Sequence, residues 1–110
     1  MHERIRCKAL EDKLMTAREA AALFSGEMTV ATSGFTMAGY PKAVPMAIAQ
    51  RAKEGVPMAL TLITGASVGP ELEESLLEAG VIRRRFPYQT NARMRRAIND
   101  GKVAYADLLL

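Results

Sequence analysis

Hydrophobic residues along this chain fall into short blocks with two different spacings. Met28 to Thr32 and Ala59 to Ile63 are nearly continuous apolar runs, which are typical of strands buried in a parallel sheet. Between them, Val44 and Ile48 lie four residues apart, as on one face of a helix, and Gly55-Val56-Pro57 ends that segment. The pattern therefore predicts a short buried strand, a helix, and a second strand covered on both faces.

The same alternation continues on either side of this unit. Thr16 to Glu19 has the spacing of a capping box and predicts a first helix from Ala17 to about Phe24. Acidic residues open a later helix, whose buried face is predicted to be Leu72, Leu76, Leu77 and Ala79, and Gly80 closes it. The remaining predicted elements are a strand over Val81–Phe86, a helix from the capping Asn91 to about Asn99, and a strand over Val103–Leu110.

Alternating strands and helices predict the α/β class, with an open, mostly parallel sheet and flanking helices. The 110 residues, 49% of them hydrophobic, are enough for one small core, so residues 1–110 are expected to form a single segment. The sequence stops on Leu108-Leu109-Leu110 with no turn or covering helix. We therefore expect an incomplete domain, cut inside a larger one.

Two glycine-punctuated loops follow the predicted strands at Ser33–Pro41 and Thr64–Pro70. Such loops are where parallel α/β sheets bind ligands, and the helix after each loop can present free amides to an anion. Plain tight turns have the same composition, so both interpretations stay open. The glycines are Gly34 and Gly39 in the first loop and Gly65 and Gly69 in the second, and Pro41 and Pro70 are expected in the first turn of the helix that follows.

Hydroxyl side chains also gather at the predicted carboxyl ends of the strands. Together with loop amides they could hold a carboxylate, but each could equally cap a helix or close a turn. They are Ser33, Thr36, Thr64, Ser67 and Thr90.

The sequence offers little catalytic chemistry of its own. His2 is the only histidine and lies at a terminus, so neither a histidine-based metal site nor a nucleophile–histidine pair is expected. Acidic residues fall mostly at predicted helix starts, where their negative charge interacts favourably with the positive end of the helix dipole. The single Cys7 excludes an internal disulfide, and with no leader sequence it predicts a reducing, cytoplasmic setting. No apolar run approaches the roughly 20 residues of a membrane-spanning helix.

The net charge of +3 is unevenly distributed, because basic residues crowd the last third of the sequence. They could attract a phosphate-rich ligand or nucleic acid. However, few aromatic residues accompany them and no nucleic-acid-binding motif is present, so a solvated face with salt bridges is favoured over a nucleic-acid partner. These residues are Arg83, Arg84, Arg85, Arg93, Arg95, Arg96 and Lys102.

The two loops, with Lys42 and Val44-Pro45, resemble the amino-terminal region of the acetyl-CoA hydrolase/transferase family, and within it the succinyl-CoA:acetate CoA-transferases. The resemblance runs over essentially the whole chain. It includes Arg4-Ile5-Arg6, Pro87-Tyr88-Gln89-Thr90, Met94-Arg95 and Ile98-Asn99-Asp100-Gly101 in the same order and spacing. Neither loop reads G-x-G-x-x-G, so the dinucleotide-binding fingerprint fails.

This resemblance implies a fold shared with ribose-phosphate isomerase-like proteins and an enzyme with two similar α/β domains. The chain would be about the first half of the first domain, and the second domain would carry a glutamate that forms a glutamyl-CoA thioester. The segment alone is therefore expected to be inactive. The resemblance implies acyl-CoA and small carboxylates such as acetate and succinate as substrates, no permanently bound cofactor, and a homodimer for the full protein.

By position, Ser67 and Thr90 match hydroxyl residues that line the family's small carboxylate pocket, and Gly34, Gly39, Gly65 and Gly69 would shape the backbone around them. The sequence departs from close relatives at Met37, where a small residue is usual, and at Gln89, where Asn is common. Two other interpretations remain open. The chain could be a stand-alone module that binds a carboxylate or phosphate, or an arginine-rich interaction domain for nucleic acid.

Overall fold

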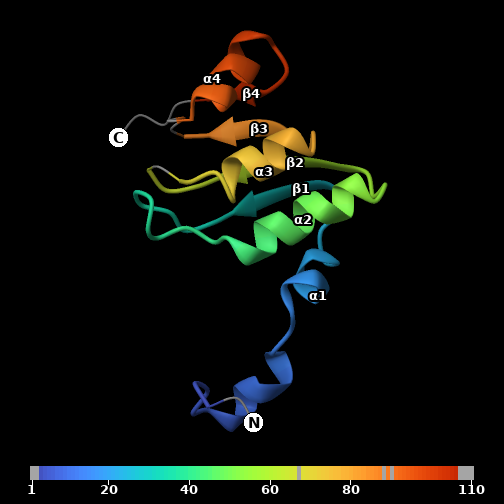
Figure 1. Ribbon diagram of the computed structural model, residues 1–110, viewed down its shortest axis with the longest axis vertical. Helices are drawn as coiled ribbons and strands as arrows, with labels where there is room; N and C mark the ends of the chain where they lie inside the picture. Colours follow the sequence, from blue (N-terminus) through green and yellow to red (C-terminus); the bar gives the residue numbers. More distant parts are fainter. Residues whose placement is uncertain (1–2, 67, 88, 90, 107–110) are drawn as a thin grey trace.

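The centre of the fold is a sheet whose strands all run in one direction (Figure 1). A computed structural model describes residues 3–66, 68–87, 89 and 91–106. Within them the strands lie side by side in chain order, and every neighbouring pair is parallel. They are β1 (Gly26–Ala31), β2 (Met58–Ile63), β3 (Ile82–Phe86) and β4 (Ala104–Tyr105). The predicted α/β class and open parallel sheet are confirmed.

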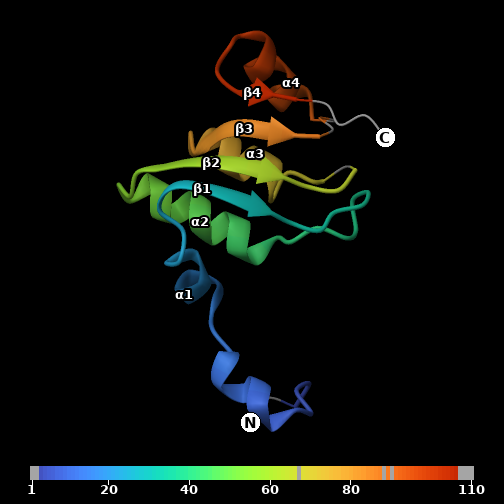
Figure 2. The same ribbon diagram turned by 180° about the vertical axis from the view of Figure 1, so that it is seen from behind.

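The helices that connect these strands pack on one face of the sheet. In Figure 1 α2 and α3 lie in front of the strands, and the view from behind in Figure 2 has the strands in front of both helices. This follows from strand order, since right-handed crossovers between successive neighbours all fall on the same side. The helical segments are η1 (Lys8–Lys13, a 3₁₀ helix), α1 (Ala17–Ala21), α2 (Ala43–Lys53), α3 (Glu73–Glu78) and α4 (Ala92–Asn99).

The core forms between this face and its helices. Leu60 and Leu62 of β2 point into it and are buried, because alternate residues of a strand share a face. Ile48 of α2 meets them from the helix layer, as its predicted spacing from Val44 requires. Leu72 and Leu76 add the buried face predicted for the third helix, while Leu77 and Ala79 are half-buried at its margin.

Two strands are less buried than their apolar sequences predict. The prediction of a buried first strand is wrong, because β1 lies at the edge of the described sheet and only Val30 is half-buried. The prediction that β2 is covered on both faces holds fully only on the helix side, since its alternate residues are half-buried and no described helix packs on the back of the sheet. Apolar content alone does not reveal on which side the crossovers pass.

Several element boundaries also differ from the predictions. The first helix ends at Ala21, three residues earlier than expected, although its capping box is present. Pro41 and Pro70 precede α2 and α3 and do not lie in their first turns. After Pro70, the amides of Leu72 and Glu73 both donate to the carbonyl of Gly69 and form a separate turn. The last strand is short, and Leu108–Leu110 lie outside the described residues.

The amino-terminal part of the chain extends away from the sheet (Figure 1). Residues 3–15, including η1, form an arm, and α1 joins this arm to the body by packing on α2. The apolar side chains of Leu10, Leu14 and Met15 are exposed on it. None of the helices in the described part of the chain combines the length and apolarity needed to cross a bilayer.

Candidate functional site

Three loops meet at the edge of the sheet where the parallel strands end. The first follows β1, the second follows β2, and the third follows β3. Because parallel strands place their carboxyl ends at one edge, loops that are distant in sequence become neighbours there. This is the site that the sequence predicted, and the first two loops are the glycine-punctuated ones.

The first and second loops touch through their backbones. A methyl group at Gly65 would overlap the carbonyl group of Gly34, and one at Gly34 would lie 2.6 Å from Cγ1 of Val68. Glycine at both positions is therefore what permits this close approach. Gly39 differs, because a methyl group there would make only an ordinary contact, 3.5 Å from the Phe35 carbonyl oxygen. The structure gives no steric reason for glycine at that position.

Tyr40 connects the same two loops through its side chain. The ring is buried, and its hydroxyl donates a short hydrogen bond to the carboxylate of Glu71. Any side chain at Gly69 would collide with this hydroxyl. The bond to Glu71 raises the pKa of Tyr40 above its ordinary value, because the negative carboxylate holds the phenolic proton in place.

The ammonium group of Lys42 lies over the ring of Tyr40. Its Nζ lies 3.9 Å from the ring centroid of Tyr40 and donates to the Tyr40 carbonyl at 3.2 Å. The sequence predicted no partner for Tyr40, and it predicted Glu71 only as one of the acidic residues that open the next helix; Glu71 instead lies before α3 and pairs with Tyr40. The available signal was the placement of an aromatic residue between a loop glycine and Pro41, since a large ring in a glycine loop needs a partner to bury it.

Two hydroxyl side chains in the described part of these loops close turns. Thr64 is buried and its Oγ1 donates to the Gly65 carbonyl at 2.9 Å. Ser33 Oγ donates to the Gly39 carbonyl at 3.4 Å and links the two ends of the first loop. Thr36 is exposed and has a left-handed backbone, with φ of 58°. The two nominated site residues Ser67 and Thr90, like His2, lie outside the described residues.

A buried ion pair lies beneath the second and third loops. Glu73, in the first turn of α3, accepts two hydrogen bonds from Arg85, in β3, and both side chains are fully buried. Burial raises the pKa of Glu73, against the opposing effect of the Arg85 guanidinium. Glu73 lies in the first turn of α3, as the acidic start of this helix predicts, but its carboxylate pairs with Arg85, so the assignment of Arg85 to a solvated face is wrong.

A β-bulge explains the inward position of Arg85. The register pairs Leu60 with Ile82 and Thr61 with Arg84, so Arg83 has no strand partner opposite it. The extra residue leaves Arg83 and Arg84 both exposed and turns Arg85 toward the helices. Strict alternation would instead have buried Arg84. The sequence contains no signal for a one-residue register shift within three consecutive arginines.

Comparison with known proteins agrees with the resemblance carried by these loops. The profile of the acetyl-CoA hydrolase/transferase N-terminal domain matches residues 1–110. The chain belongs to the acetyl-CoA hydrolase/transferase family. It is 45% identical to a succinyl-CoA:acetate CoA-transferase of Clostridium kluyveri over 109 residues, which are 98% of this chain and 20% of that protein.

Other relatives carry both transferase and hydrolase names. A propanoyl-CoA:succinate CoA transferase of Escherichia coli is 45% identical over 87% of this chain, and an acetyl-CoA hydrolase of Eremothecium gossypii is 36% identical over 97%. The chain spans about a fifth of the length of these relatives, 20% and 21% respectively. The crystal structure of RipA from Yersinia pestis shares the fold, with a TM-score of 0.62 and 23% identity over 96% of this chain and 25% of that one.

Met37 and Gln89, the two positions expected from the sequence to differ from close relatives, have different surroundings. Met37 is 64% exposed in the first loop and fills no described cavity. Gln89 instead donates from Nε2 to the carbonyl oxygen of Arg85 at 3.4 Å, so it connects the third loop to β3. A shorter Asn would reach less far toward this carbonyl group.

Several basic residues of this family segment have acidic partners. Arg83 pairs with Glu27, and Arg93 pairs with Glu78, both at exposed positions. Neutralised in this way, these arginines present less positive charge than the sequence implies. The described residues contain no group of three or more His, Cys, Asp or Glu side chains that could hold a metal ion.

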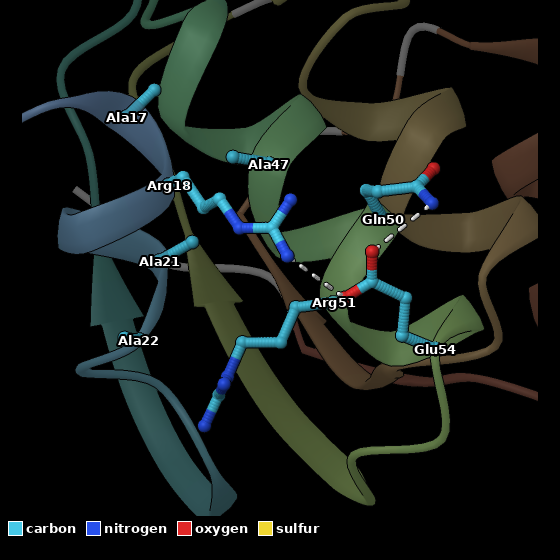
Figure 3. Close-up of a pocket in the computed structure, with 8 residues that line it drawn as sticks. All are labelled: Ala17, Arg18, Ala21, Ala22, Ala47, Gln50, Arg51 and Glu54. Atoms are coloured by element: carbon cyan, nitrogen blue, oxygen red, sulfur yellow. Dashed lines mark hydrogen bonds and ion pairs between the residues drawn. The ribbon is translucent and has the colours of Figure 1, made fainter.

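A groove of about 380 Å³ lies elsewhere on the family segment, between α1 and α2 (Figure 3). Small side chains form much of its lining, namely Ala17, Ala21, Ala22 and Ala47. Its polar residues interact with one another: Glu54 accepts from Gln50 at 3.5 Å and lies 3.8 Å from the Arg18 guanidinium. Among its lining residues the carboxylate of Glu54 is held by Gln50 and Arg18, so the loop edge remains the candidate site.

Proposed function

We propose that this segment is the amino-terminal part of an enzyme that moves CoA from an acyl-CoA to a small carboxylate, such as acetate or succinate. The observation that carries the proposal is the family match over residues 1–110, which includes all three loops at the sheet edge. The relatives bear transferase and hydrolase names, so water is the alternative acceptor.

The proposed chemistry uses a glutamate outside this segment. Its carboxylate attacks the acyl carbonyl and expels CoA as the thiolate, leaving an acyl-glutamyl anhydride. The thiolate then attacks the glutamyl carbonyl, releases the first carboxylate and forms a glutamyl-CoA thioester. An acceptor carboxylate repeats these two steps in reverse, so the glutamate is regenerated and CoA leaves on the acceptor.

In this proposal the segment contributes groups that orient the carboxylate. Ser67 in the second loop and Thr90 in the third would donate O–H groups to its oxygens, and the glycine-loop amides would add backbone donors. We place the enzyme in the reducing cytoplasm, in keeping with the single cysteine of this segment, Cys7, which is exposed. We further propose that the full protein is a homodimer.

The test is a CoA-exchange assay on the full-length protein and its Ser67→Ala and Thr90→Ala variants. Each variant is expected to raise KM for the carboxylate roughly tenfold, the cost of one lost hydrogen bond to a charged group, without lowering the melting temperature. Ser25→Ala and Thr29→Ala, at exposed positions away from the loops, are matched controls. Unchanged KM in both variants would remove Ser67 and Thr90 from the site.

The same assay separates the two candidate functions. Transfer by the full-length protein, with none by residues 1–110 alone, supports the proposal. The binding-module interpretation replaces the proposal if residues 1–110 bind acetate or phosphate as a stable monomer and the full-length protein does not exchange CoA. Turnover by residues 1–110 alone would contradict a glutamate located outside the segment.

A further inference from the structure

The Arg85–Glu73 pair is unusual because both charged side chains are 0% exposed. Oε2 of Glu73 accepts from Nε of Arg85 at 3.2 Å and from Nη2 at 2.9 Å. The two residues come from α3 and β3, the elements that flank the second and third loops of the candidate site. The pair therefore joins the supports of two loops that approach the same edge.

Stability alone does not account for this pair. Removing two charges from water costs free energy that their attraction offsets only when every polar atom is satisfied, and well-packed apolar residues often serve equally well. Here Oε1 of Glu73 has no hydrogen-bond partner among the described residues. The raised pKa of Glu73 has the same cause, because desolvation outweighs the favourable charge of Arg85.

The pair is connected to the second loop at both of its ends. Nη1 of Arg85 donates to the carbonyl of Phe86, and this carbonyl also accepts from the amide of Thr64 at 3.2 Å. At the other end, the amide of Glu73 donates to the carbonyl of Gly69 at 3.2 Å. Through these bonds, the Arg85–Glu73 pair connects the beginning of the second loop, at Thr64, to its end, at Gly69.

The same residues also fix the start of the third loop. Phe86 is the last residue of β3, and Gln89 donates back to the carbonyl of Arg85 at 3.4 Å. A guanidinium bonds through a rigid planar fork, so it sets direction as well as distance. An apolar pair of similar volume would fill the space without fixing the relative placement of the loops.

We propose that Arg85 and Glu73 are positioning residues that hold the second and third loops in the relative placement required to bind the carboxylate substrate. This inference rests on the proposed function. It assigns the pair no contact with substrate, only control of the backbone that carries the binding groups.

The experiment replaces both charges at once in the full-length protein, with Arg85→Met and Glu73→Leu combined. The melting temperature is expected to stay the same or rise, while kcat/KM for the carboxylate falls on the order of 10- to 100-fold. Hydrogen exchange of the backbone amides of the second and third loops, in residues 64–69, 86 and 88–90, is expected to accelerate. Arg85→Lys keeps the charge but not the fork, so it should not preserve activity.

The matched control is the double variant Arg93→Met with Glu78→Leu, because this pair of the same residue types is exposed. It should leave kcat/KM and loop exchange unchanged. If the Arg85→Met, Glu73→Leu variant keeps wild-type kcat/KM and wild-type loop exchange, the pair is simple packing and the inference is overturned. A fall in melting temperature that accompanies the loss of activity also overturns it, since the role would then be structural.

Failure of the proposed function gives a different result. In that case the wild-type protein does not exchange CoA, and loop exchange alone tests the positioning role. Faster exchange confined to the two loops in the Arg85→Met, Glu73→Leu variant supports positioning of an unidentified site. Unchanged exchange overturns the inference independently of any activity.

Discussion

Gly65 and Gly39 belong to neighbouring glycine loops, but only Gly65 faces another backbone at close range. Its missing side chain is the space occupied by the carbonyl of Gly34. Gly39 has no such neighbour, and its contacts with Phe35 are of ordinary length. At the residue scale, the same amino acid is therefore a steric requirement in one loop and a tolerated choice in the other.

Gly65→Ala tests this difference. The added methyl group must separate the two loops, so we expect a loss of about 1–3 kcal/mol in the free energy of unfolding, measured by chemical denaturation. Gly39→Ala is the matched control and should change this free energy by less than about 0.5 kcal/mol. Equal effects of the two substitutions would contradict the close packing of the loops.

Tyr40 is expected to make the free energy of unfolding depend on pH in the alkaline range. Its folded-state pKa is raised above the ordinary 10.0, so the hydroxyl bond to Glu71 contributes fully below pH 10 and is lost as pH rises through the folded-state value. Lys42, over the ring, is the nearby cation. The difference in unfolding free energy between wild type and Tyr40→Phe should therefore stay constant from about pH 8 to about pH 9 and narrow as the pH rises above about 10.

Tyr105→Phe, at an exposed tyrosine of β4, controls for the loss of a phenolic hydroxyl without this partner. If the difference in unfolding free energy between wild type and Tyr40→Phe also stayed constant above about pH 10, the Tyr40 hydroxyl bond would make no pH-dependent contribution to stability.

At the element scale, Asn91 begins α4 and also connects it to α3. Its Oδ1 accepts from the amides of Arg93 at 2.8 Å and Met94 at 3.1 Å, and its Nδ2 donates to Glu74 at 3.0 Å. A capping residue normally serves one helix, whereas this one serves two. The third loop ends at this residue, so its placement depends on both helices.

Asn91→Ala is expected to lower the free energy of unfolding by about 1–2 kcal/mol, because the cap and the bond to Glu74 are lost together. The measurement is urea denaturation. Asn99→Ala, at the exposed last position of α4, is the control with the same change in side chain and should be nearly neutral. If Asn99→Ala lowered the free energy of unfolding as much as Asn91→Ala, the effect would be due to helix propensity and not to the cap.

At the scale of the whole molecule, the arrangement leaves three apolar or unpaired surfaces. The back of the described sheet lacks helices, β1 is an edge strand, and the amino-terminal arm exposes Leu10, Leu14 and Met15. The family relatives are about five times longer than this segment, since it covers 20% or 21% of each. We propose that these surfaces are where contacts with further polypeptide form.

Residues 1–110 alone are therefore expected to self-associate, because an exposed strand edge and exposed apolar side chains bind one another. Sedimentation velocity at increasing concentration should show species larger than a monomer. Replacing Leu10 and Leu14 by Ser should reduce the association, whereas replacing the exposed Lys8 and Lys13 of the same arm by Ser should not. A monomer at every concentration would contradict this expectation.

The sequence by itself determined the α/β class, the order of elements and the caps at Thr16 and Asn91. These features depend on local spacing, since hydrophobic period and capping chemistry act within a few residues. The glycine loops and their family resemblance were equally local, and they placed the candidate site at the carboxyl edge of the sheet.

Only the tertiary structure decided how distant segments meet. The one-sided placement of the helices made β1 an exposed edge, and a single-residue bulge turned Arg85 inward to Glu73. The bond from Tyr40 to Glu71 joins residues 31 positions apart. Such pairings depend on strand register and crossover side, which are set by the packing of the whole sheet and leave no periodic signal in the sequence.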